Sequence, residues 1–131
     1  MTQVWFESMN NVFHKMHVSD APPSFILHEF TGPDDGDPHD HPFDIEVTIL
    51  RGGYEERRYD PKTGTPKVLY RKPGDTFIIL ATAIHRINQL LDGPCLTMAT
   101  YGPWVQEPGF WRFDHGGAMR RQHNLQEWVR K

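Results

Sequence analysis

Cysteine is almost missing from this chain, which has only Cys95 among its 131 residues. A single cysteine excludes an internal disulfide and the kind of zinc site that uses several thiolates. Long hydrophobic runs are also missing, because only 37% of the residues are hydrophobic and none of their runs could span a bilayer. Residues 1–15 lack the cationic start and apolar core of a signal peptide. We therefore expect a soluble, cytoplasmic protein that does not bind membranes.

Positive charge is scarce in the first part of the chain. Residues 1–50 hold one cation, Lys15, against nine acids, whereas residues 51–131 hold 13 cations and eight acids; the net charges of −8 and +5 give −3. Nucleic-acid binding needs a basic stripe, and acids neutralise the nearest candidate, "EERR" at 55–58. We therefore expect no nucleic-acid partner and, instead, a small-molecule substrate.

Turn-forming residues divide the chain into short segments, since it contains 11 glycines and 11 prolines. Its length predicts one domain, residues 1–131. Several short apolar segments with strand-like patterns lie between the turns, which predicts an all-β, antiparallel sandwich or barrel with its core at about 24–101 and a tail at 102–131. The expected strands are residues 24–30, 43–50, 51–59, 67–72, 76–80, 84–91 and 95–101.

Three further elements are predicted from local patterns. Apolar residues at positions 4, 5, 9, 12, 13 and 16 fit a short amphipathic helix over about 2–16. A second short helix is predicted at 124–130. An Asp-Gly turn at 92–93 predicts that residues 84–91 and 95–101 form a β-hairpin.

One short segment, "GDPHDHPFDIE" at 36–46, gathers side chains that commonly bind metals. His39 and His41 lie on the same side if the segment is extended, because side chains repeat every two residues. Glu46 lies an odd number of residues from both histidines, so a regular strand would send its side chain to the opposite face. A kink or bulge at Pro42 would return Glu46 to the histidine side and would make the apolar side chains of 43–49 pack outward.

A third imidazole is expected from His85, which follows the Pro-Gly-Asp turn at 73–75. Two histidines and a carboxylate suit a divalent first-row metal with open coordination positions. Histidine also has many roles without a metal, so solvent exposure or local hydrogen bonding is the competing interpretation. That interpretation is adopted for the remaining histidines, at 14, 17, 28, 115 and 123, which we expect to be structural or exposed.

The two blocks together resemble the cupin superfamily. Its first motif, His-x-His, four residues, Glu and then a glycine, is similar to residues 39–53, and its second, Pro-Gly-Asp before a histidine and an Asn, is similar to residues 72–88. The chain departs from the second motif at "ILATAIH", which lacks the usual proline and glycine. The resemblance covers about residues 24–101. It implies a cupin-like jelly roll, a double-stranded β-helix, that binds one divalent transition metal per chain through His39, His41, Glu46 and His85.

Within that superfamily, the nearest likeness is to cysteine dioxygenase-type proteins. Their second block ends in Ser-x-His-x-Tyr; Tyr101 matches the tyrosine, whereas Thr97 and Ala99 replace the serine and the histidine. These enzymes bind iron through three histidines and hold the substrate carboxylate with an N-terminal arginine. No arginine precedes Arg51 here and Glu46 is retained, so the resemblance supports the fold and the ligands more than cysteine as the substrate.

Two residues are candidates for catalysis. Tyr101 either hydrogen-bonds a substrate or bound oxygen, or ends its strand with the hydroxyl in solvent. Arg57 either clamps a substrate carboxylate or belongs to a solvated charged strand. Asp40 and Asp44 are expected to orient the histidine ligands through their second ring nitrogens.

The resemblance implies a metal-dependent oxidoreductase, a dioxygenase-like enzyme in which Fe(II) is favoured and Mn, Ni and Zn stay open. Two alternatives are an isomerase, lyase or epimerase that uses the metal as a Lewis acid, and a metal-containing module that binds a small ligand. The substrate stays open, as does the oligomeric state, for which a homodimer is one option.

Overall fold

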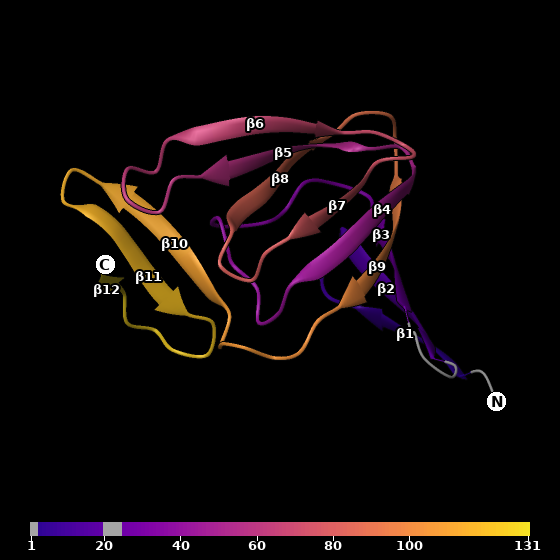
Figure 1. The fold of residues 1–131 in the computed structure, drawn as a ribbon, viewed down its shortest axis with the longest axis horizontal. Coiled ribbons are helices and arrows are strands. Elements are labelled where there is room, and N and C mark those ends of the chain that lie inside the picture. Colours follow the sequence, from indigo (N-terminus) through magenta and orange to yellow (C-terminus); the bar gives the residue numbers. More distant parts are fainter. Residues whose placement is uncertain (1–2, 20–24) are drawn as a thin grey trace.

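The chain is built from β-strands in the computed structural model, which describes residues 3–19 and 25–131 (Figure 1). No helix occurs in these two ranges, and so none that could cross a membrane. The strands are β1 (Gln3–Ser8), β2 (Phe13–Ser19), β3 (Phe25–Phe30), β4 (Ile45–Arg51), β5 (Tyr54–Tyr59), β6 (Pro66–Arg71), β7 (Thr76–Ile79), β8 (Ile84–Leu90), β9 (Cys95–Tyr101), β10 (Gly109–Asp114), β11 (Gly117–Gln122) and β12 (Val129–Arg130). The predicted all-β class is confirmed.

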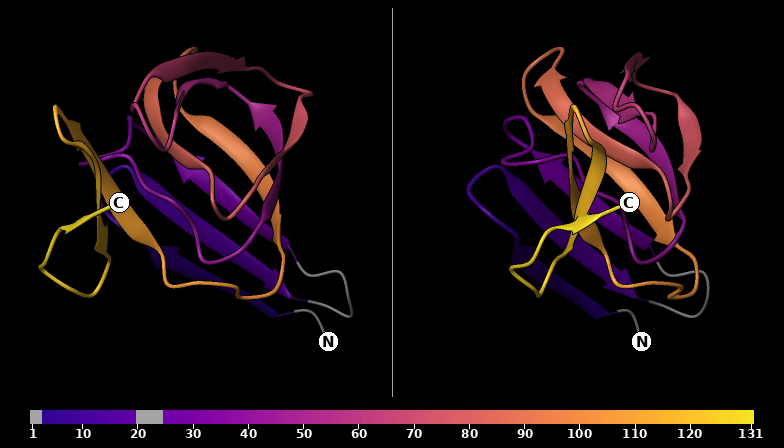
Figure 2. Two further views of the ribbon diagram at one scale, coloured as in Figure 1. Left: turned by 60° about the vertical axis from the view of Figure 1, so that its left-hand side comes forward. Right: turned by 90° about the vertical axis from the view of Figure 1, so that its left-hand side faces the viewer.

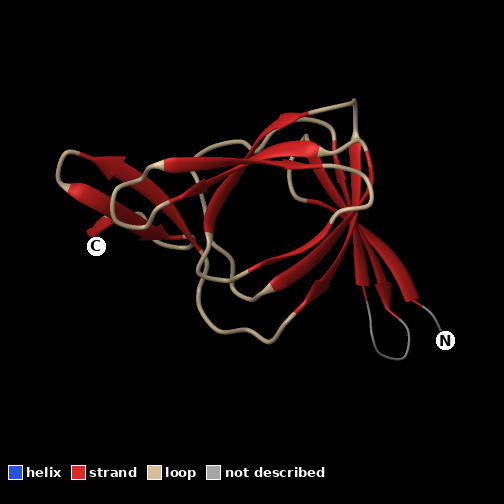
Figure 3. Cartoon of the chain, turned by 45° about the horizontal axis from the view of Figure 1, so that its top comes forward, coloured by secondary structure: helices blue, strands red, loops and turns tan. Residues whose placement is uncertain are grey.

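The strands form antiparallel sheets that curve around a common interior (Figures 2 and 3). A six-stranded sheet has the order β1-β2-β3-β9-β4-β7, and a three-stranded sheet has the order β6-β5-β8. Strands β10, β11 and β12 form a third sheet on the side away from the N-terminus (Figure 1). The backbone of His39 bridges β8 and β10, because it pairs with both His85 and Phe110. This single residue therefore links the site region to the C-terminal strands.

The core lies between the six-stranded sheet and the β6-β5-β8 sheet, and it follows a regular alternation of side chains. On β4, Ile45, Val47 and Ile49 are buried, whereas the residues between them are more exposed. The buried apolar cluster is made of Phe30, Ile45, Val47, Ile49, Tyr54, Ile79, Ile87, Cys95 and Ala99. Burial of a large apolar side chain stabilises a fold by about 1.5–3 kcal/mol, so this face of β4 has to point inward.

The predicted N-terminal helix is wrong, because β1 and β2 form a hairpin over most of that range. Their register runs from Gln3 opposite Ser19 to Ser8 opposite His14. The Asn10 side chain closes the turn by accepting hydrogen bonds from the amides of Val12 and Phe13, at 2.8 and 2.9 Å. A helix of this length is marginal by itself, whereas β2 also pairs along β3 and so gains a second hydrogen-bonded partner.

Two other local predictions are also wrong. Strands β8 and β9 do not pair with each other: β8 pairs with β5, and β9 pairs with β3 and β4. The Asp-Gly turn reverses the chain as expected, but it passes from one sheet to the other. The segment predicted as a helix at 124–130 contains β12 instead, which pairs with β11 through Met119 and Arg130.

The Gly-Gly turn between β4 and β5 also crosses between the sheets. Gly52 and Gly53 have φ angles of 87° and 92°, which favour glycine. A Cβ atom at Gly52 would lie 2.5 Å from the carbonyl oxygen of Pro94, and one at Gly53 would lie 2.5 Å from that of Arg71. Glycine is needed at both positions because the backbone at Pro94 lies against Gly52 and the backbone at Arg71 lies against Gly53.

Candidate metal centre

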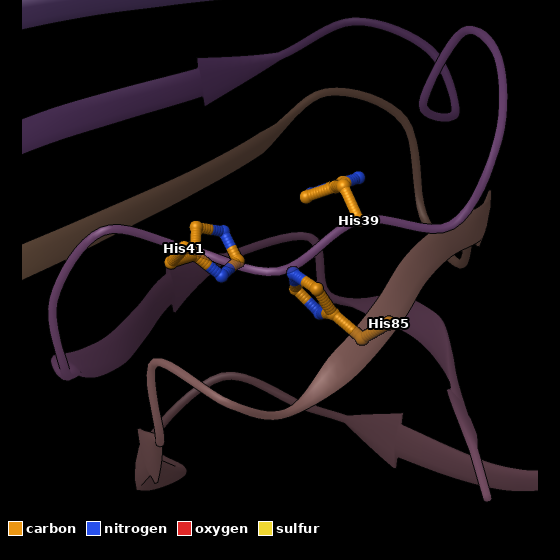
Figure 4. A group of neighbouring side chains, drawn as sticks. All are labelled: His39, His41 and His85. Atoms are coloured by element: carbon orange, nitrogen blue, oxygen red, sulfur yellow. The ribbon is translucent and has the colours of Figure 1, made fainter. Parts of the chain in front are cut away.

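Three histidines from two distant parts of the chain lie close together (Figure 4). One ring nitrogen from each of His39, His41 and His85 lies within 4.8 Å of the others. Backbone hydrogen bonds set this arrangement: the His39 amide donates to the His85 carbonyl at 2.9 Å, and the His85 amide donates to the His39 carbonyl at 3.0 Å. Alternation along the extended segment then places His41 on the same side as His39.

The ring nitrogens have the properties that metal ligands need. His41 Nδ1 and His85 Nε2 are buried without any hydrogen-bond partner among the described residues. Burial lowers the pKa of His39 to about 4, and the nearby His85 adds to the effect. Burial also lowers the pKa of His41 well below its usual value, and nearby His85 adds to the effect. His39 and His41 are therefore neutral near pH 7, and a neutral imidazole is the form that binds a divalent metal.

A buried carboxylate supports His85 from behind. Glu56 Oε2 lies 2.9 Å from His85 Nδ1, and Glu56 Oε1 accepts hydrogen bonds from Arg58 and Arg71, both at 3.0 Å. Burial acts to raise the pKa of Glu56, but the hydrogen bond from His85 and the proximity of His85, Arg58 and Arg71 outweigh it and lower the pKa to about 2. The carboxylate is therefore ionised, holds a proton on His85 Nδ1 and leaves Nε2 free for a metal.

Sequence reasoning assigned the carboxylate to Glu46, and the structure does not bring Glu46 to the three histidines. Glu46 is exposed on β4, where it pairs with Thr100 and Ile78. The kink expected at Pro42 does not return Glu46 to the histidine side, because Ile45, Val47 and Ile49 are the buried residues of β4. The expectation that the apolar residues of β4 pack outward is wrong, since they form the core.

Asp40 and Asp44 anchor loops, and within the described residues neither of them hydrogen-bonds a histidine ring. The Asp40 carboxylate is 4% exposed and accepts hydrogen bonds from the Gly109 amide, from Trp111 Nε1 and twice from Arg120, at 2.7–3.1 Å. Asp44 Oδ1 accepts from the Ala81 amide at 2.7 Å. Because Asp40 stands between the two histidines of the loop, its contacts fix that loop against the C-terminal strands.

A cavity of about 210 Å³ adjoins the histidines. Its wall is largely apolar, and it also contains Lys15, His28, Asp34, Thr97 and Tyr101. This volume is below the range of about 300–1,000 Å³ that is typical of pockets for drug-sized ligands. The cavity therefore fits a small molecule.

Of the two residues predicted to be catalytic, Tyr101 lies in this wall and Arg57 does not. The Tyr101 hydroxyl is 2.9 Å from His28 Nε2, and the Tyr101 ring stacks on Phe43 with centroids 4.3 Å apart. Burial raises the pKa of Tyr101, with the negative charge of Glu7 adding to it. Arg57 Nε instead pairs with the neighbouring Glu55 at 3.4 Å, and its side chain is 40% exposed.

Two residues of the site were not predicted from the sequence. His28 was expected to be structural or exposed, but it is buried between β2 and β9 and its pKa is lowered to about 3, first by burial and then by the charges of Lys15 and His17. The signal was available, because His28 alternates with Phe30 on one face of a strand. Glu56 was hidden in "EERR", which looks like an exposed charged strand.

Comparison with known proteins shows the fold. None of the protein-family models matches this chain, and the comparison with curated proteins found no significant match. Among solved structures, hydroxypropylphosphonic acid epoxidase from S. wedmorenis matches with a TM-score of 0.61 and 12% identity over 76% of this chain and 56% of the epoxidase. Fe(II)-HppE with the alternative substrate (S)-1-HPP matches with a TM-score of 0.57 and 14% identity, over 77% and 56% of the two chains.

The Drosophila melanogaster CENP-C cupin domain matches with a TM-score of 0.61 and 9% identity, over 76% of each chain. This chain therefore has the cupin fold, and it spans a little over half the length of the epoxidase. At these identities the likeness concerns the fold alone.

Proposed function

We propose that this chain is a metal-dependent enzyme, an oxygenase with one non-haem iron ion that acts on a small molecule. The observation that carries the proposal is the convergence of His39, His41 and His85 beside a largely apolar cavity. Two of their buried ring nitrogens have no hydrogen-bond partner among the described residues. Imidazole ligands suit iron, zinc, copper and nickel. Iron is favoured because a protein of the same fold, HppE, has been crystallised with Fe(II).

The chain's own residues have defined tasks in this proposal. The three histidines would hold Fe(II), which when bound supplies a redox centre for O₂ and a template for the substrate. Glu56 keeps His85 in the ligand tautomer. The apolar wall excludes water, which strengthens polar contacts inside the cavity. The Tyr101 hydroxyl, which hydrogen-bonds His28, would also hydrogen-bond the substrate.

Elemental analysis of protein purified without added metal tests the ligand set. Wild type should carry close to one iron ion per chain, and His39→Ala and His85→Ala should each lose it. Glu46→Gln is the matched control and should keep the metal, because Glu46 is exposed on the other face of β4. Full iron content in both histidine variants would overturn the proposed site. Oxygen consumption that stops in an anaerobic chamber, with a panel of small acids as substrates, tests the oxygenase assignment.

A second candidate is a non-redox enzyme with zinc, such as an isomerase, lyase or epimerase. It is favoured by the absence of a carboxylate from the ligand group, since three histidines are also a ligand set of catalytic zinc. Stoichiometric zinc, together with turnover that is independent of O₂, would support this candidate over the oxygenase. Ligand binding without turnover would instead support the binding module.

A further inference from the structure

A row of polar side chains crosses the cavity-facing side of the six-stranded sheet. Glu7 of β1 is directly opposite Lys15 of β2, Lys15 is opposite His28 of β3, and His28 is opposite Thr97 of β9. Residues that are directly opposite on neighbouring strands lie on the same face. Lys15, His28 and Thr97 all line the cavity, and so does Tyr101, which hydrogen-bonds His28.

Lys15 brings a cation to this wall. Its ammonium lies 5.4 Å from the ring centroid of Phe13 and 5.7 Å from that of Tyr101. The opposite carboxylate, Glu7, hydrogen-bonds His17 instead, at 3.2 Å. Within residues 3–19 and 25–131 no ion pair or hydrogen bond reaches the Lys15 ammonium. Burial lowers the pKa of Lys15, with the charge of Glu7 opposing that effect. An anion bound beside the ammonium would compensate this lost hydration.

Thr97 independently indicates a ligand in the same place. Its side chain is 0% exposed, and its hydroxyl has no hydrogen-bond partner among the described residues. Leaving a buried hydroxyl unpaired is unfavourable, whereas a ligand oxygen in the cavity would pair with it. Lys15, His28 and Thr97 are the members of the row that line the cavity, and His28 lies between the other two.

We propose, on the basis of the function proposed above, that the cavity binds a small monocarboxylic acid with an apolar body. Its carboxylate would lie among Lys15, Thr97 and Tyr101, and its other end would point toward the three histidines. A single cation matches a single negative charge. Asp34 also lines the cavity, and its Oδ2 atom accepts the Ile87 amide at 2.7 Å, so the anion is repelled from that part of the wall.

The apolar lining fits the rest of such a molecule. Phe30, Phe43, Ile45, Val47 and Ile79 all contribute to it. The volume of about 210 Å³ suits a short chain or a single ring. A doubly charged phosphate would leave one charge without a partner.

Calorimetric titration of the purified holoprotein with hexanoate and with hexanamide tests the proposal, because the two probes differ mainly in charge. Wild type should bind hexanoate about tenfold or more tightly than hexanamide, as expected for a charge-assisted hydrogen bond. Lys15→Met should remove this preference. Lys67→Met, the same substitution at an exposed position on β6, should keep it. Thr97→Val should weaken hexanoate binding several-fold with little effect on the fold.

Equal affinity for the two probes in wild type would overturn the proposal, and so would inorganic phosphate that competes as strongly as hexanoate. A repeat after metal removal with EDTA separates the two hypotheses. A preference that survives EDTA and is lost in Lys15→Met supports the carboxylate site, even if the native metal is not iron. A preference that is lost with EDTA and kept in Lys15→Met places the carboxylate on the metal and refutes the role of Lys15.

Discussion

The Glu56→Gln substitution is expected to weaken metal binding and to destabilise the fold. In wild type both carboxylate oxygens accept hydrogen bonds: Oε2 from His85, and Oε1 from Arg58 and Arg71. A glutamine amide has only one oxygen, so its NH₂ group has to face one of these donors. It will face His85, because His85 can move its proton to Nε2 whereas the two guanidinium groups cannot lose theirs. That tautomer blocks the ring nitrogen that would bind the metal.

The size of both effects follows from the contacts. Loss of a hydrogen-bond partner behind a ligand histidine typically weakens metal affinity by about 10–100-fold. Breaking a buried ion pair costs about 3–5 kcal/mol, but the side chains of Arg58 and Arg71 are 29% and 16% exposed, so water recovers part of it. We expect the free energy of unfolding to fall by about 2–4 kcal/mol.

Two assays measure these effects: competition with a metal chelator, and urea unfolding of the metal-free protein at pH 7. Glu46→Gln makes the same chemical change on the exposed face of β4 and should change the free energy of unfolding by less than about 0.5 kcal/mol. Wild-type metal affinity in Glu56→Gln would refute the reasoning. Metal loss in Glu46→Gln as complete as in His39→Ala would also refute it, because Glu46 would then be the ligand.

Three other predictions concern His28, Asp40 and Arg57. His28 has a pKa of about 3 in the fold and an ordinary value of 6.5, so the unfolded chain binds the proton more strongly and stability falls as the pH drops from 6.5 toward 3. In urea unfolding at pH 7 and pH 5, His28→Gln should reduce this loss of stability by about 2 kcal/mol. An unchanged loss would contradict the burial argument. Asp40→Ala should lower the free energy of unfolding by about 3–5 kcal/mol and speed amide hydrogen exchange in β10 and β11 more than in β4, whereas uniform acceleration would argue against a local anchor. Arg57→Gln should leave metal content unchanged and unfolding within about 0.5 kcal/mol, and loss of metal would reveal a role that its exposed ion pair does not show.

Much of the fold was predictable because alternation and turn chemistry are local properties. The strands from β3 to β9 fall where apolar patterns lie between glycine and proline turns. Pairing partners were not predictable, because they depend on contacts between distant segments. The same apolar positions near the N-terminus fit a helix or a hairpin, and pairing of β2 with β3 decides between them. Asp92 and Gly93 likewise signal a turn without indicating that it passes between sheets.

The metal site was likewise predictable only in part. His39, His41 and His85 were identifiable from their spacing and from motif resemblance, and the structure brings them together. Glu46 was assigned by adding a kink to an otherwise regular strand, although the plain alternation of β4 already placed it on the exposed face. Glu56 could not be recognised, since a register shift between Glu55 and Glu56, invisible in the sequence, accompanies its pairing with β8.

Main-chain pairing determines where the first histidine stands. The His39 amide and carbonyl are both bonded to His85, and the flanking amide of Asp40 donates to the Gly109 carbonyl at 3.0 Å. None of these bonds involves an imidazole. The backbone at position 39 is therefore held in place independently of the side chain that it carries. Aspartate or cysteine could be exchanged into it during evolution or by design, changing the preference from borderline toward harder or softer ions while the surrounding architecture stays intact.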